Sequence, residues 1–305
     1  MTIRRVHVII TSGGPSLYYR ILLPLRHLNP MRYHVTWTCP DAKDLKPGDI
    51  VLAQNIPDSS FWAEACVMAD VLTVYDLAGP LPFSVAQASA LARADLVTVA
   101  TPAMGKVLDG IRPTVEVIPS CLSVDWVANV RFNARDEVYV GWAGADLREA
   151  DWQGLGLKLK TFSRREGRAR FRAIGHDPFA PHVSASKRPW QPNSDARWND
   201  LEFDIGLAPL SDSHDNRLTD WVQVMEYSAK GIVPVASPVG QAVDWIEHGV
   251  NGFLAESPDQ WLESLLKLSD DQFREKVSCA AMSRAEEWTV DKMIFMWESA
   301  YERCS

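Results

Sequence analysis

The chain has 305 residues, 47% of them hydrophobic, and a formal net charge of −8, which excludes a disordered protein and gives no overall attraction to nucleic acid or acidic membranes. Its five cysteines are scattered without a CxxC pair, so a disulfide framework or zinc site is not expected and a reducing cytoplasm is favoured. No apolar run approaches the roughly 18 residues of a membrane-spanning helix.

The first half of the chain alternates short apolar runs with helical patterns, as parallel α/β proteins do. One helix is predicted over residues 17–28, because apolar side chains recur there on one stripe. The predicted strands each run into polar or turn residues and are, in chain order, Val6–Ile10, Tyr33–Trp37, Ile50–Ala53, Val71–Tyr75, Leu96–Val99 and Val115–Ile118.

Two places at the ends of these strands are candidates for substrate contact. Gly13 and Gly14 follow the first strand, where a glycine either admits a substrate or diphosphate or simply forms a turn. Asp76 follows the fourth strand. A carboxylate there either contacts an acceptor hydroxyl or acts as its base, or it belongs to an ordinary strand-end turn.

The strand-and-helix rhythm then restarts, which predicts a second sheet. Residues 137–144 predict a strand that runs into a glycine turn, and residues 171–174 and 204–207 predict later strands. The boundary between the two halves is expected in the polar stretch 128–136. The densest basic stretch, Lys158–Arg172, has seven Lys and Arg residues; it is interpreted as a solvated helix end, with a nucleic-acid patch as the alternative.

One further helix is predicted from Arg217 to Lys230, with Asp215 or Asn216 as its cap and Gly231 as its stop. The N–H groups and positive dipole end at its start would suit a pyrophosphate, with Arg217 and Thr219 as further donors. The alternative is an ordinary capped surface helix. In the tail, Ser257 and Gln260 predict a capping box, and a terminal helix is predicted from about residue 290 to 301.

The segment 204–254 resembles the donor-binding half of a family 4 glycosyltransferase of the GT-B fold. The resemblance rests on the joint order and spacing of Asp204-Ile205-Gly206-Leu207, Pro209-Leu210, Glu226-Tyr227, Gly231, Pro234-Val235-Ala236-Ser237, Val239-Gly240, His248-Gly249 and Asn251-Gly252. In the first half, Tyr19-Arg20-Ile21 followed by Pro24 also fits that pattern.

The resemblance implies an α/β protein with two Rossmann-like domains whose parallel sheets face a central cleft. Residues 1–130 would form the acceptor-binding domain and residues 131–288 the nucleotide-sugar-binding domain. Residues 289–305 would form a helix that packs back on the first domain.

The resemblance also implies roles for single residues. Glu226 matches the second of two family glutamates, the one that contacts the ribose hydroxyls of the nucleotide. Leu218 stands at the first glutamate position, a departure that puts the usual sugar-hydroxyl contact in doubt. Four further residues are expected to border the donor, with the last as a stacking surface for the nucleobase: Gly144, Arg148, Arg188 and Trp190.

The implied activity is transfer of a hexose from a UDP-sugar to an acceptor hydroxyl, with retention of anomeric configuration and without a bound cofactor or obligatory metal. The acceptor stays open between hydroxymethylated DNA, a glycan and a protein. The compact chain is also similar to phage-encoded transferases, some of which modify 5-hydroxymethylpyrimidine bases in DNA, and this would place it in the host cytoplasm. Two alternatives are a nucleotide-sugar-binding protein without catalysis, which Leu218 favours, and a sugar-nucleotide epimerase of the same fold.

Overall fold

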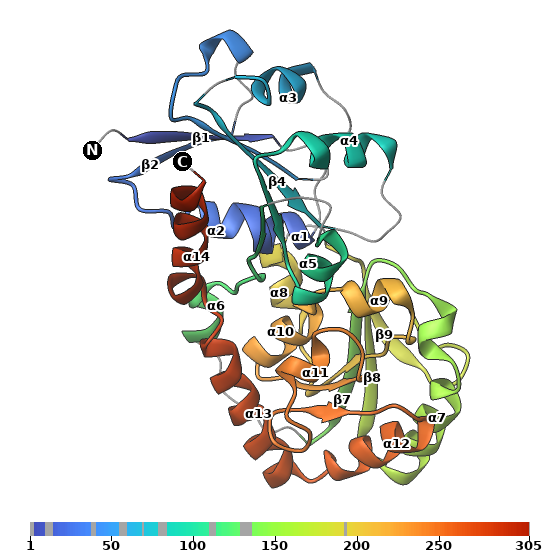
Figure 1. The fold of residues 1–305 in the computed structure, drawn as a ribbon. Coiled ribbons are helices and arrows are strands. Elements are labelled where there is room, and N and C mark those ends of the chain that lie inside the picture. Colours follow the sequence, from blue (N-terminus) through green and yellow to red (C-terminus); the bar gives the residue numbers. More distant parts are fainter. Residues whose placement is uncertain are drawn as a thin grey trace. The chain divides into compact units, whose positions relative to one another are not determined.

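The protein, seen here as a computed structural model, is an α/β protein built on two six-stranded parallel sheets (Figure 1). The structure describes residues 3–9, 15–37, 41–54, 60–68, 70–78, 84–109, 114–128, 136–191 and 194–304. The chain divides into two compact units, the first made of Met1–Cys121, Leu218–Asp220 and Val290–Ser305, and the second of Leu122–Arg217 and Trp221–Thr289.

The sheet of the first unit has the strand order β2-β1-β3-β4-β5-β6. Its strands are β1 (Arg4–Ile9), β2 (Tyr33–Thr36), β3 (Ile50–Gln54), β4 (Leu72–Leu77), β5 (Leu96–Val99) and β6 (Val115–Val117). The helices of this unit are α1 (Pro15–Leu17), the π-helix η1 (Tyr18–Leu22), α2 (Leu23–Leu25), the 3-10 helix η2 (Ala42–Asp44), α3 (Ser60–Ala65), α4 (Val85–Arg93), α5 (Pro102–Leu108) and α14 (Val290–Arg303).

Both faces of this sheet are buried, as in other parallel sheets covered by helices. Val6, Val8 and Leu52 lie in an apolar cluster with Trp297 and Tyr301 of α14. The neighbouring strand positions point to the other face, where Val51 and Ala53 pack in a second cluster with Trp62 of α3. All six strands predicted for this half are present, with ends that differ by at most two residues.

The helix predicted over residues 17–28 is shorter and less regular than expected. It runs from α1 through η1 to α2 and ends at Leu25. Pro24 has no N–H to donate to the carbonyl of Arg20, four residues before it. The preceding turn is widened to the π form, in which the N–H of Leu23 donates to the carbonyl oxygen of Tyr18. Such turns are rare and often lie near functional residues.

A buried ion pair lies at the centre of the first unit. Arg20, on η1, is 1% exposed and Asp76, on β4, is 0% exposed. One Asp76 oxygen accepts hydrogen bonds from Arg20 Nη2 and from Thr98 Oγ1 at 2.7 Å, and the other from Arg20 Nε at 3.0 Å and Gln54 Nε2 at 2.8 Å. A carboxylate has about four acceptor positions, so this network occupies all of them.

A second buried carboxylate, Asp49 at the start of β3, is held by residues of β1. Arg5 Nε donates to it at 2.9 Å, the Lys46 N–H donates at 2.9 Å, and His7 Nε2 lies 3.3 Å from the same group. Burial acts to raise the pKa of Asp49, but the hydrogen bonds from Arg5 and Lys46 outweigh burial and hold that pKa below its ordinary value.

Acid stability should therefore depend on Asp49. A carboxyl whose folded pKa is lowered contributes stability above its unfolded pKa of about 3.9, and loses that contribution as the pH falls through the folded pKa. We expect the urea midpoint of Asp49→Asn to be lower than that of the wild type at pH 7 and to fall less steeply below pH ~4. The exposed residue Glu64 on α3 supplies the control, Glu64→Gln, which should keep the wild-type pH dependence. Parallel curves for wild type and Asp49→Asn would contradict the assignment.

The sheet of the second unit has the strand order β12-β11-β10-β7-β8-β9. Its strands are β7 (Val138–Gly144), β8 (Ala169–Gly175), β9 (Ala185–Arg188), β10 (Ile205–Ala208), β11 (Val233–Ala236) and β12 (Phe253–Leu254). Its helices are α6 (Val124–Ala128), the 3-10 helix η3 (Glu149–Trp152), α7 (Leu155–Arg165), α8 (Ser194–Asp200), α9 (His214–Leu218), α10 (Val222–Ala229), α11 (Ala242–Trp245), α12 (Pro258–Lys267) and α13 (Asp271–Glu286).

Helices cover both faces of this second sheet. The crossovers β7-α7-β8 and β10-α10-β11 leave the sheet centre in opposite directions, so right-handed connections place α7 and α10 on opposite faces. In Figure 1, α12 lies beside α7, and α13 lies beside α10. The capping box predicted at Ser257 and Gln260 is present at the start of α12, and Trp261, Leu262 and Leu265 of that helix are buried. No helix in the described ranges has the length and hydropathy needed to span a membrane.

Candidate functional site

The carboxyl edge of the second sheet has a topological switch point at β7. This strand, the first of the unit, lies between β8 and β10, and in open α/β sheets ligands bind where neighbouring connections leave in opposite directions. The ladder between β7 and β10 joins Val140 to Ile205 and Gly141 to Gly206. Both strands run on past it, to Gly144 and Ala208, so the strands separate at their carboxyl ends.

Two side chains of α10 fill this separation. The Tyr227 hydroxyl accepts the Ala143 N–H at 3.1 Å and donates to the Leu207 carbonyl at 3.4 Å. Gln223 Nε2 donates to the Ala143 carbonyl at 2.7 Å and to the Tyr227 oxygen at 2.9 Å. Side-chain hydrogen bonds thus replace the ladder beyond Gly206, and burial raises the pKa of Tyr227, which keeps its hydroxyl proton in place.

The ends of β7 and β8 meet beside this split. The His176 N–H donates to the Gly144 carbonyl at 3.2 Å. Gly175 has φ +91°, and a Cβ there would lie 2.1 Å from the Gly144 oxygen and 3.5 Å from the Cβ of Trp190. Gly144, Gly175 and Trp190 therefore lie side by side. A Cβ on Gly144 would also lie 2.2 Å from the Trp142 indole, so close packing already requires glycine at this position.

Trp190 is connected to Glu226 through Arg197. The Arg197 guanidinium lies over the Trp190 ring, 4.9 Å from its centroid. Arg197 Nη2 and Nε donate to the same Glu226 oxygen, Oε1, at 2.5 and 3.2 Å. Arg197 is 1% exposed and Glu226 is 4% exposed. A ring, a guanidinium and a carboxylate are thus stacked and paired along one edge of the unit.

Three of the predicted donor residues are therefore brought together: Gly144, Trp190 and Glu226. Two residues that were not predicted, Gly175 and Arg197, connect them. A sequence signal for Gly175 existed, because a glycine follows a predicted strand at 171–174. No comparable signal marks Arg197, since its burial depends on a partner in another helix.

The predicted cations each have a polar or charged partner. Arg188 on β9 pairs with Asp200 and Glu202, and the hydrogen bond to Asp200 holds the pKa of Arg188 above its ordinary value. Arg217 is exposed and pairs with Asp212. Arg148, in the loop after β7, donates to the Asn216 side-chain oxygen at 3.3 Å. Their roles toward a donor stay predictions.

The single helix predicted from Arg217 to Lys230 is wrong. The structure has α9, which ends at Leu218, and α10, which begins at Val222. In a continuous helix the Leu218 carbonyl would accept the Val222 N–H, but it accepts the Thr101 hydroxyl at 3.1 Å. Trp221 is non-helical, with φ −103° and ψ 56°.

The ends of these two helices differ in how well they match the prediction. The cap predicted at Asp215 or Asn216 is also wrong, because Ser213 accepts the Asn216 N–H at 3.2 Å just before α9. The predicted stop at Gly231 is confirmed, with φ +74°.

The remaining candidates belong to the first unit or lie outside the described residues. Gly13 and Gly14 fall outside the described ranges. Thr219 is exposed and is grouped with the first unit. Asp76 lies in the buried network with Arg20, and its role toward an acceptor stays a prediction.

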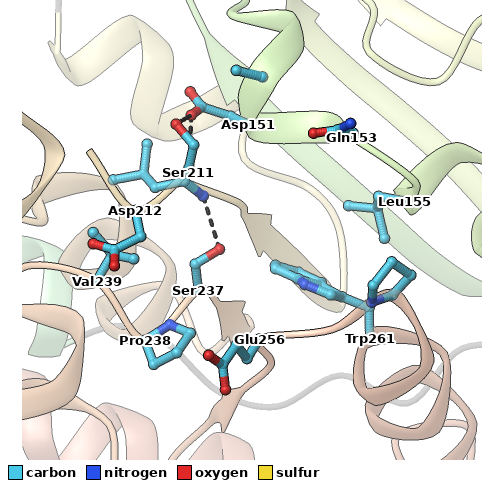
Figure 2. A pocket seen from close by; sticks show the side chains of 13 residues that line it. Asp151, Gln153, Leu155, Ser211, Asp212, Ser237, Pro238, Val239, Glu256 and Trp261 are labelled. Atoms are coloured by element: carbon cyan, nitrogen blue, oxygen red, sulfur yellow. Dashed lines mark hydrogen bonds between the residues drawn. The ribbon is translucent and has the colours of Figure 1, made fainter.

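A cavity of about 290 Å³ lies on the carboxyl edge of the second sheet, between the loops that follow β7, β10, β11 and β12. Figure 2 shows Ser211 hydrogen-bonded to Asp151, with Asp212, Glu256 and Trp261 around the cavity. Three of its thirteen lining residues are acidic and none is Lys or Arg. Asp212 is paired with Arg217, and the charge of the other two acids disfavours a diphosphate inside the cavity itself. In the described ranges, no cluster of three or more His, Cys, Asp or Glu side chains is arranged to hold a metal ion.

The basic stretch Lys158–Arg172 is partly neutralised. Four of its cations form ion pairs with acidic side chains: Lys158 with Asp259, Arg168 with Glu166 and Asp271, Arg170 with Glu137, and Arg172 with Glu202. These pairs reduce the attraction that the stretch offers to nucleic acid.

No family model and no curated protein sequence matches the chain. Solved structures do match it. Anabaena Alr3699/HepE, in complex with UDP, is 14% identical with a TM-score of 0.69, over 99% of this chain and 100% of that one. The pneumococcal O-GlcNAc transferase GtfA, in complex with UDP and GlcNAc, is 14% identical with a TM-score of 0.65, over 86% of this chain and 58% of that one.

A mutant of S. aureus TarM, also in complex with UDP, is 13% identical with a TM-score of 0.65, over 84% of this chain and 55% of that one. The aligned part of this chain thus spans little more than half the length of the TarM and GtfA chains. At these identities the likeness shows the fold, which is the GT-B fold of glycosyltransferases.

Proposed function

We propose that this protein is a glycosyltransferase that moves a hexose from a UDP-sugar to an acceptor hydroxyl, with the nucleotide bound by the second unit. The observation that carries the proposal is the burial of Glu226 and its pairing with Arg197, whose guanidinium also lies over the Trp190 ring. The match to Alr3699/HepE, which has been solved with UDP and with UDP-glucose, supports this donor class.

Each part of the nucleotide has a matching group in this arrangement. The Glu226 carboxylate suits the two ribose hydroxyls, because it accepts hydrogen bonds and donates none. The Trp190 ring suits a stacked base. The diphosphate would lie toward Gly144, with Arg148 and Arg217 as its cations. Arg217 would exchange its exposed partner Asp212 for a phosphate oxygen, and exposed ion pairs are weak enough to allow this.

In the proposed reaction the bond between the anomeric carbon and the diphosphate oxygen breaks, and UDP leaves. The acceptor oxygen forms a bond to the anomeric carbon and gives up its proton to an oxygen of the departing diphosphate. Holding both substrates in register removes most of the entropic barrier, and the cations stabilise the negative charge that develops on the diphosphate. Retention of configuration belongs to the proposal, without an assigned protein nucleophile and without a bound metal.

Ligand-induced thermal stabilisation tests the donor site. A ligand at about a hundred times its dissociation constant adds roughly 2.7 kcal/mol of stability. We expect UDP and UDP-hexoses to raise the melting temperature of the wild type, and Glu226→Ala to lose this shift. Glu256→Ala, in the acidic cavity, is the control and should keep it. A folded wild type that responds to no nucleotide diphosphate would overturn the donor-site assignment, and a shift lost in Glu256→Ala instead would move the site to the cavity.

A second candidate, a nucleotide-sugar-binding protein without catalysis, is favoured by Leu218. This residue is buried among apolar side chains that include Met104 and Leu108, so it offers no hydrogen bond to a sugar. Release of UDP in the presence of glycans, proteins or hydroxymethylated DNA separates the two candidates. Donor binding without UDP release from any acceptor class would favour the binding protein.

A further inference from the structure

The Arg197 guanidinium is the group that touches both Trp190 and Glu226. Its Nε and Nη2 donate to Glu226 Oε1, and its central carbon lies over the Trp190 ring, 4.9 Å from the centroid. We propose that Arg197 is a positioning residue that fixes the Glu226 carboxylate for ribose recognition and thereby sets a preference for ribonucleotides over deoxyribonucleotides. This inference rests on the proposed function, since it concerns the same nucleotide site.

The first step of the argument is orientation. A carboxylate held through one hydrogen bond rotates about its terminal torsion, which is broad for Glu. Two donors from one rigid guanidinium onto the same oxygen remove that freedom. With Oε1 fixed by Arg197, the carboxylate plane of Glu226 is fixed as well. A carboxylate of fixed plane holds a pair of neighbouring hydroxyls better than a rotating one.

The second step concerns charge. Glu226 is almost fully buried, and a buried carboxylate without a cation is costly. The Arg197 charge compensates Glu226 where solvent cannot. A carboxylate accepts hydrogen bonds at both oxygens, which is the capacity that a pair of ribose hydroxyls requires.

The third step is the link to the base. Arg197 Nη1 also donates to the Gln191 carbonyl at 3.4 Å, so the guanidinium is tied to the segment that carries Trp190. The Cβ of Trp190 lies beside Gly175. The surface for the base and the acceptor for the ribose are therefore held in one register by a single side chain.

A buried arginine can also be purely structural, and the second unit contains a comparison. Arg274 on α13 is 0% exposed and pairs with Asp271 at 2.9 Å. It donates to the Leu268 carbonyl at 2.7 Å and lies on a helix away from the strand ends at the switch point. It matches Arg197 in the burial of the guanidinium and in having a carboxylate partner, although Asp271 is 39% exposed, so it supplies a control for the loss of a buried arginine.

The test is the ratio of dissociation constants for 2′-deoxy-UDP and UDP, with 3′-deoxy-UDP as a second probe, measured by calorimetry on the full chain. The wild type should prefer UDP by about tenfold or more, the value of one hydrogen bond to a charged group. Glu226→Ala should bring the ratio near one. Arg197→Lys keeps the charge but loses the rigid fork, and Arg197→Met loses both, so both should lower the ratio at least threefold. Arg274→Lys should leave it unchanged.

The outcomes separate the inference from the function on which it rests. A purely structural role for Arg197 would lower stability, or weaken UDP and its deoxy forms equally, and the unchanged ratio would overturn the inference while leaving the donor site intact. If Arg197→Met does not fold, Arg197→Lys alone decides by the same ratio. A wild type that binds neither nucleotide would overturn the proposed function and this inference together.

Discussion

Replacing Arg20 with Met is expected to lower the free energy of unfolding of the first unit by about 3–5 kcal/mol, because it leaves the fully buried Asp76 without its cation. Gln54 and Thr98 would still donate to Asp76, but neither carries a charge. Urea unfolding measures the loss, and hydrogen exchange of the β3, β4 and β5 amides localises it to this unit.

The double variant Arg20→Met, Asp76→Leu separates the ion pair from the packing around it. Replacing both members of a buried pair by apolar groups is often close to neutral, but Gln54 and Thr98 also donate to Asp76 and would lose that acceptor. The double variant should therefore recover part of the stability lost in the single one. The exposed pair of Arg303 with Glu116 provides the control, since Arg303→Met should change little. A double variant less stable than Arg20→Met would contradict the uncompensated charge of Asp76 as the main cause of the loss.

The second large effect is expected for Gly175→Ala, which should lower the free energy of unfolding by more than about 3 kcal/mol. An alanine at φ +91° pays a strain of about 1–2 kcal/mol. Its Cβ would also lie 2.1 Å from the Gly144 carbonyl oxygen, a backbone atom held in the β7–β8 ladder. The ends of the two strands would have to separate.

Gly249→Ala isolates the strain alone. Gly249 has φ +79°, and a Cβ there would meet nothing within 4 Å, so its variant should lose only about 1–2 kcal/mol in the same urea unfolding measurement. Equal losses in the two variants would contradict the close approach of β8 to β7. If nucleotide binding by the second unit is established, Gly175→Ala should also weaken it, whereas Gly249→Ala should not.

Strands were the best predicted part of this fold because each was a short run of buried residues bounded by turns. β3 is an example, since Ile50 to Ala53 are all buried and are followed by polar residues. β9 and β12 were not predicted. β9 has two small residues followed by two charged ones at the edge of the sheet, and β12 is two residues long, so neither contains an apolar run.

Helices were predicted less well wherever a tertiary contact interrupts a continuous pattern. From Leu218 to Ala229 the apolar residues recur at the spacing of a continuous helix. In the structure, however, α9 ends at Leu218, whose carbonyl accepts a hydrogen bond from the Thr101 hydroxyl. A hydroxyl 117 positions away in the chain leaves no sign in the local period. The π turn around Arg20 was equally hidden, although Pro24 was visible and marks the place where an i−4 hydrogen bond must be missing.

In the candidate site, too, local patterns were visible in the sequence and tertiary partners were not. Gly144, Trp190 and Glu226 were proposed from motifs and from the resemblance to GT-B proteins, and contacts through Gly175 and Arg197 connect them in the structure. Arg197 was missed because a buried Arg and an exposed Arg look alike in a sequence. Arg188 and Arg217 were chosen for their charge, but the carboxylates that neutralise them, among them Asp200 and Asp212, are apparent only in the folded chain.

Tyr227, whose hydroxyl lies between β7 and β10, makes the residue types at positions 206 and 227 depend on one another. A Cβ on Gly206 would lie 2.3 Å from the Tyr227 ring, so this aromatic residue and the missing side chain occupy complementary space. A larger residue at position 206 fits only if position 227 is first replaced by a smaller residue. A smaller residue at position 227 leaves a void unless position 206 is replaced by a larger one. Related sequences should therefore differ at both positions or at neither.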